Sequence, residues 1–150
     1  MNIFSGTATT AAIHEAGHVI ALIRGNHKFS YVTIKPAAND QYDTYGHVAV
    51  PAPVAASPRV LLAGMAAEAV NLGRKRTIPF WVYVANASDR DKLGPFERAL
   101  SAKDMQNIER MTVQFIRDEW HNVLRIADEL VARETLTYAD VHRVLRDGHQ

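Results

Sequence analysis

The sequence contains no cysteine, and this absence removes several kinds of chemistry at once. It excludes disulfide bonds, metal sites with thiolate ligands and a cysteine nucleophile. Any metal ion would therefore have to be bound by histidine and carboxylate side chains. The search for a metal site narrows to the 7 histidines of the chain.

The chain also lacks an excess of charge of either sign. Lys and Arg number 17 against 16 Asp and Glu, so no basic field is available to gather phosphates over a large surface. We therefore do not expect nucleic acid as a partner.

Long apolar runs are missing as well. No stretch approaches the roughly 18 uninterrupted apolar residues of a membrane span. Residues 1–6 contain no basic segment leading into an apolar one, as a secretory signal would. The sequence thus predicts a soluble, cytoplasmic protein without a membrane partner.

The composition is that of an ordinary folded domain. Apolar residues make up 47% of the 150 residues and charged residues 22%, far from the composition of disordered chains. No internal repeat, low-complexity tract or domain boundary is visible. We expect a single domain over residues 1–150 with one core.

The first half of the chain has patterns typical of a helix, a small sheet and a second helix. Apolar residues recur at three- and four-residue steps over 10–24, with Thr9 or Thr10 as a cap and Gly25 as a left-handed stop. Two segments rich in β-branched and aromatic residues, 29–36 and 45–51, predict an antiparallel pair joined by a turn at 37–40.

The second half is predicted to be mainly helical. An apolar, Ala-rich helix over 60–72 follows Ser57-Pro58, ends at Gly73 and should be buried on most sides. Residues 74–95 have the composition of a loop with short ordered pieces. The spacing over 101–131 predicts one long helix or two with a bend near Trp120, and 138–145 a short helix capped by Thr137. The expected fold class is α+β, mainly α-helical, with a small antiparallel β-sheet.

One motif within the first predicted helix carries chemistry. Residues 14–18 read His14-Glu15-Ala16-Gly17-His18, the HExxH pattern. Residues four apart on a helix lie one above the other, so both imidazoles can bind one ion, and Glu15 can act as general base on a water that the metal activates. A glycine inside a helix costs about 1 kcal/mol relative to alanine, which indicates that something packs closely against Gly17.

Two histidines leave a catalytic zinc ion one protein ligand short, since such sites usually have three. Glu68 is the one charge on the apolar helix and needs a partner if it is buried. Asp89 and Asp91 lie in the polar segment that follows. Four of the other histidines complete the candidates: His27, His47, His121 and His142.

These motifs resemble the peptidase domain of the FtsH family of ATP-dependent zinc proteases. The resemblance rests on AIHEAGH at 12–18, VTIKP at 32–36 with YGHV at 45–48, and VLLAGMAAE at 60–68. It continues through ASD at 87–89 and, more weakly, through the C-terminal helices and Leu136-Thr137. Nearly the whole chain is covered, in the family's order.

The resemblance implies a zincin-like metallopeptidase domain whose third zinc ligand is an aspartate in a loop that opens a helix. Asp89 matches that position best, with Asp91 as a close competitor because Gly94-Pro95 interrupts the helical pattern of the family. Glu68 would orient a ligand rather than bind the metal. The strand at 45–51 would be an edge strand that can pair with an extended substrate.

Two features of the family are absent from the sequence. There is no G-x-x-x-x-G-K-[ST] motif for ATP and no membrane-spanning segment. We therefore expect action on peptides or unfolded segments, with a separate ATPase partner or a homo-oligomer as possible assemblies.

The sequence predicts a Zn²⁺-dependent peptidase with His14, His18 and Asp89 as metal ligands and Glu15 as the catalytic base. The alternative is a non-catalytic metal-binding or interaction domain that keeps the same scaffold. The basic run 74–76 is interpreted as solvated loop charge. The apolar stripe of the C-terminal helices is interpreted as core, with an oligomer interface as the weaker alternative.

Overall fold

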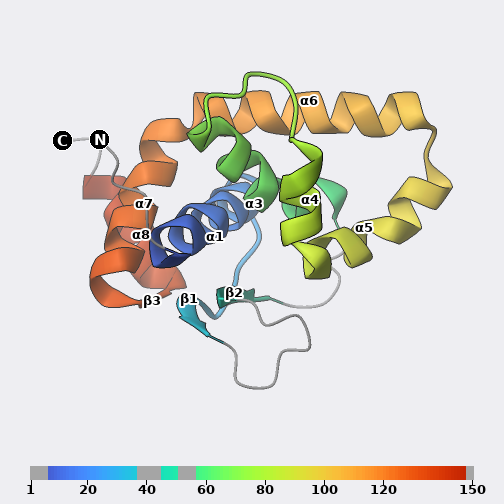
Figure 1. Cartoon of the computed structure of the whole chain (residues 1–150). Helices are drawn as coiled ribbons and strands as arrows, with labels where there is room; N and C mark the ends of the chain where they lie inside the picture. Colours follow the sequence, from blue (N-terminus) through green and yellow to red (C-terminus); the bar gives the residue numbers. More distant parts are fainter. Residues whose placement is uncertain (1–6, 37–44, 51–56, 148–150) are drawn as a thin grey trace.

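The protein is a mainly helical α+β structure (Figure 1). The computed structural model describes residues 7–36, 45–50 and 57–147. These residues form seven helices and a three-stranded antiparallel sheet, which confirms the expected fold class. None of the described helices combines the length and the apolar character needed to cross a membrane.

Helix α1 (Thr7–Arg24) is the central element of the fold. It packs against α3, α7 and the sheet, and residues 11–22 are buried (Figure 1). The helix begins three residues earlier than predicted, so the expectation that Thr9 or Thr10 caps it is wrong. The left-handed residue after the helix is Asn26 (φ 61°) rather than Gly25, because asparagine also tolerates this conformation.

Helix α3 (Pro58–Asn71) lies directly against α1. As predicted, it is buried on most sides and begins with a proline, and Gly73 (φ 86°) follows its end. A Cβ at Gly17 would run into the carbonyl oxygen of Ala63 and lie 2.8 Å from the Cβ of Ala67. The prediction that something packs closely on Gly17 is thus confirmed, and that neighbour is α3.

The sheet consists of β1 (Tyr31–Pro36), β2 (Tyr45–Ala49) and β3 (Thr135–Thr137) in the order β2-β1-β3. The predicted pairing of the first two strands is confirmed, with β2 at an edge. Strand β3 was not predicted, because three residues are too few to show an alternating pattern. Val32 and Leu136 pair across β1 and β3 and are fully buried. The predicted turn at 37–40 lies outside the described residues.

The segment 74–95, predicted as mostly loop, contains two helices. These are α4 (Phe80–Ala85) and α5 (Ala87–Ala99). Pro95 lies inside α5, where it removes one backbone hydrogen bond without ending the helix. Leu93 is fully buried and Phe96 packs against the core, so tertiary packing outweighs the local preference for a loop.

Three helices close the chain: α6 (Ala102–Asp118), α7 (Trp120–Arg133) and α8 (Tyr138–Asp147). The break at Glu119 shows that, of the two predicted alternatives, two helices with a bend near Trp120 is the correct one. Thr137 caps α8 as predicted, since its Oγ1 accepts from the Asp140 N–H while the Asp140 carboxylate accepts from the Thr137 N–H. Most of the apolar stripe packs in the core, although Met111 and Val131 are exposed.

An ion pair joins the end of α1 to the bend between α6 and α7, and it makes stability depend on pH. The Arg24 guanidinium donates two hydrogen bonds to the Glu119 carboxylate, at 2.7 and 3.0 Å. These bonds lower the pKa of Glu119, against a smaller opposing effect of burial. The stabilisation is therefore present above the pKa of an unfolded glutamate, about 4.3, and is lost as the pH falls through the lower folded value.

We expect Glu119→Gln to lower the free energy of unfolding at pH 7 by about 0.5 kcal/mol, a small value because the largely exposed Arg24 is screened by solvent. The difference from wild type should shrink as the pH falls below about 4.3 and vanish only below the lowered pKa of folded Glu119. Urea denaturation at several pH values measures the free energy of unfolding and its dependence on pH. The control is Asp128→Asn, a change at an exposed residue. A difference independent of pH would show that the charge of Glu119 is not the cause.

Candidate metal centre

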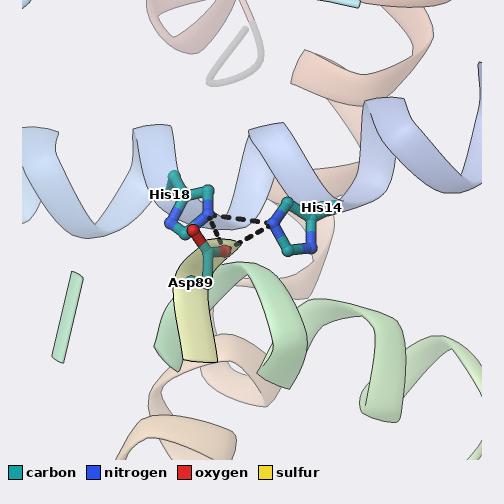
Figure 2. A group of neighbouring side chains, drawn as sticks. All are labelled: His14, His18 and Asp89. Atoms are coloured by element: carbon teal, nitrogen blue, oxygen red, sulfur yellow. Dashed lines mark hydrogen bonds and ion pairs between the residues drawn. The ribbon is translucent and has the colours of Figure 1, made fainter. Parts of the chain in front are cut away.

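Three side chains from two helices meet between α1, α3 and α5. His14 and His18 lie one turn apart on the face of α1 that meets α3, and Asp89 comes from the first turn of α5 (Figure 2). Oδ2 of Asp89 lies 2.9 Å from Nε2 of His14 and 3.0 Å from Nε2 of His18. The two Nε2 atoms are 3.0 Å apart. Three potential ligand atoms thus converge on one point.

The opposite nitrogen of each ring is engaged by an oxygen. Nδ1 of His18 donates to the carbonyl oxygen of Val60 at 2.7 Å, and Nδ1 of His14 donates to Oε2 of Glu68 at 2.7 Å. A carbonyl oxygen can only accept, so the proton of His18 must lie on Nδ1. Both Nε2 atoms are therefore directed at the cluster, the arrangement in which metal-binding histidines are usually held.

The spacing of the three atoms suits a metal ion. In a tetrahedral zinc site with bonds of about 2.0–2.1 Å, neighbouring ligand atoms lie about 3.3–3.4 Å apart, only about 0.4 Å more than here. Helix α3 leaves room because residue 64 is glycine: a Cβ there would lie 2.5 Å from Nε2 of His18 and 2.6 Å from Nε2 of His14. The buried group of His14, His18 and Asp89 could therefore bind a metal ion.

The electrostatics of the cluster favour positive charge at its centre. Burial alone would lower the pKa of both histidines, but Asp89, together with Glu68 in the case of His14, outweighs burial and raises them. Burial alone would raise the pKa of Asp89, yet the two histidines hold it well below its usual range. Protons supply the positive charge when no other cation does, and a metal ion would displace them.

Glu15 lies beside this cluster, but its carboxylate has a different environment. It is 5% exposed, and no described residue forms a hydrogen bond with it. Burial raises its pKa, and the nearby His14 and His18 offset part of that rise. A buried carboxylate with a raised pKa next to a metal-binding group is suited to accept and return a proton.

The structure distinguishes between the candidates for a third metal ligand. Asp89 joins the two histidines, whereas Asp91 is exposed and lies outside the cluster. Glu68 contacts His14 through Nδ1, the nitrogen that faces away from the cluster, which agrees with an orienting role. In the described part of the chain, no group of metal-binding side chains includes any of the other histidines: His27, His47, His121 and His142.

Two residues of the centre were missed by the sequence reasoning. Gly64 allows α3 to lie against the histidine rings, and Asn86 donates to Oε2 of Glu68 at 2.9 Å and to the Val82 carbonyl at 2.8 Å. A glycine inside an otherwise continuous apolar helix was a usable signal, as it was at Gly17. Asn86 gave no signal, because an asparagine in a polar segment is ordinary.

Comparison of the sequence with models of known protein families and with curated proteins finds no match. The resemblance to the FtsH peptidase domain therefore stays a prediction that rests on the residues quoted above.

Proposed function

We propose that this chain is a zinc-dependent peptidase of the HExxH type that hydrolyses peptide bonds in peptides or unfolded segments. One observation carries the proposal: Nε2 of His14, Nε2 of His18 and Oδ2 of Asp89 lie within 3.0 Å of one another. Glu15, adjacent in sequence to His14, supplies a buried carboxylate beside them.

The donor set favours zinc over other common metal ions. Two imidazole nitrogens and one carboxylate oxygen form one of the usual ligand sets of catalytic zinc, which leaves a fourth position open. Calcium and magnesium prefer sites made of oxygen atoms alone, and the chain has no cysteine to favour softer ions.

The residues around the group have distinct roles in the proposed reaction. Zinc bound here would supply Lewis-acid chemistry, polarising the scissile carbonyl and making water more acidic. Glu15 accepts a proton from the water whose oxygen forms the new bond to the carbonyl carbon. As the C–N bond breaks, Glu15 returns that proton to the leaving amine. Glu68 and the Val60 carbonyl keep the two rings in position throughout.

The fold supports a zincin-like interpretation of the site. Both histidines and the general base come from one helix that lies beside a small sheet, and β2 forms an edge of that sheet. An edge strand has free backbone groups with which an extended peptide can pair. The proposed substrates, peptides and unfolded segments, suit such a strand because they can adopt an extended conformation.

The proposal is tested by measuring zinc content and the hydrolysis of casein or a peptide, with and without a chelator. We expect about one zinc ion per chain, activity that the chelator removes and zinc restores, and a higher melting temperature with zinc. Asp89→Asn should lose zinc and activity, while the matched variant Asp91→Asn should keep both. Zinc binding without hydrolysis would instead indicate a non-catalytic metal-binding domain, and no zinc binding would contradict the proposal.

A further inference from the structure

An exposed apolar patch lies on α4, the short helix that follows α3 and precedes α5 in the chain. Phe80 is 69% exposed, Trp81 56% and Val84 52%, and together they form what we name the α4 patch. Leu72, at the end of α3, is 51% exposed. Single exposed apolar residues are common, but three on one six-residue helix indicate a surface that contacts something apolar.

The patch is held outward by contacts on the opposite side of α4. Val82 is fully buried, and the backbone N–H of Ile78 and the hydroxyl of Tyr83 both donate to the Glu109 carboxylate, at 2.9 and 2.8 Å. Residues 80, 81 and 84 share one side of a helix with 3.6 residues per turn, whereas residue 82 faces the other way. The apolar side chains are thus presented to solvent by an anchored segment.

Basic residues lie on both sides of the α4 patch in the sequence. Arg74, Lys75 and Arg76 are all exposed in the connection that leads from α3 to α4 (Figure 1). The guanidinium of Arg90 lies 5.5 Å from the centre of the Phe80 ring. Residues 74–98 contain six Lys and Arg against three Asp and Glu, one of which is Asp89 of the metal centre, while the whole chain is almost balanced.

We propose that the α4 patch and the basic run 74–76 together bind the surface of a lipid bilayer that carries anionic headgroups. Aromatic rings partition into the boundary between headgroups and acyl chains, and neighbouring basic side chains pair with anionic lipids. Both elements lie within one continuous segment, 72–84, which suits shallow contact with a flat surface. The inference departs from the expectation of no membrane partner, because that expectation rested on the lack of a membrane-spanning run, and contact with one bilayer surface needs no such run.

Trp81 offers a direct reporter of this contact. The other tryptophan, Trp120, packs against the core, so Trp120→Phe leaves Trp81 as the single tryptophan, which can be excited selectively at the long-wavelength edge of its absorption. We expect its emission to shift to the blue when vesicles of phosphatidylglycerol and phosphatidylcholine are added, and not with phosphatidylcholine alone. The shift should weaken as salt increases. This experiment does not depend on metal binding or on peptidase activity.

Vesicle sedimentation of the full chain separates the contribution of the basic run 74–76 to binding from that of the α4 patch. Neutralising the run with Arg74→Gln, Lys75→Gln and Arg76→Gln should weaken binding roughly 100-fold, at about fivefold per charge. Neutralising three exposed basic residues elsewhere, Lys103, Arg117 and Arg146, should weaken it much less. Trp81→Ser should reduce binding, whereas Met111→Ser, at a somewhat more exposed apolar residue on α6, should not.

Three results would overturn the proposal. The first is equal binding to both kinds of vesicle, and the second is binding to neither. The third is a dimer in sedimentation velocity that Trp81→Ser dissociates, together with no vesicle binding, which would assign the patch to contact between copies of the chain. Apart from Trp120→Phe, all variants change exposed residues, and the melting temperature of each variant reports whether the fold is retained.

Discussion

Replacing Glu15 by glutamine is expected to lower kcat by about 10²–10⁴-fold while zinc content stays unchanged. Glutamine has nearly the same shape as glutamate, but its amide cannot accept a proton from water. Glu15 forms no hydrogen bond with a described residue, so the substitution breaks no structural contact that the described part of the chain shows. The melting temperature should not fall, because burying the neutral amide avoids the cost of burying a charge.

The matched control is Glu97→Gln, the same change at an exposed position of α5. Its kcat and zinc content should equal those of wild type. Full activity of zinc-loaded Glu15→Gln would remove Glu15 from the mechanism. Loss of zinc in this variant would instead mean that Glu15 contributes to metal binding.

Gly64→Ala is expected to abolish zinc binding, or to weaken it by at least about 10- to 100-fold, the loss seen when neighbours of metal ligands are changed. The added Cβ would lie 2.5 and 2.6 Å from the Nε2 atoms of His18 and His14. An ion bound to both nitrogens needs the same space. The rings cannot rotate away without breaking the hydrogen bonds that Nδ1 makes with Val60 and Glu68.

Gly94→Ala provides the control for a glycine inside a helix. A Cβ there would meet only the end of the flexible Arg98 side chain, at 3.2 Å. This variant should bind zinc normally, because alanine is the better helix former and nothing rigid is displaced. Isothermal titration with zinc measures both variants, and circular dichroism reports whether each is folded. Wild-type affinity in a folded Gly64→Ala protein would contradict the assignment of this space to the metal ion.

Much of the local structure could be predicted because it depends on neighbours in sequence. The apolar spacing of α1 and α3, the bend near Trp120 and the Thr137 cap each depend on a few consecutive residues. The elements that were not predicted depend instead on residues that are distant in the sequence. Helix α5 exists because Leu93 and Phe96 pack against the core, although its sequence is polar and contains Pro95. The pairing of β3 requires β1, more than 100 residues away.

The sequence by itself determined that two imidazoles and a carboxylate share one helical turn, since the i and i+4 positions of a helix always lie together. Only the tertiary structure decided which further side chains join the two histidines. Asp89 and Glu68 reach His14 across 75 and 54 residues of chain. Asp89 and Asp91 are two residues apart on α5 and so point in directions about 160° apart, and the packing of α5 decides which of them faces α1.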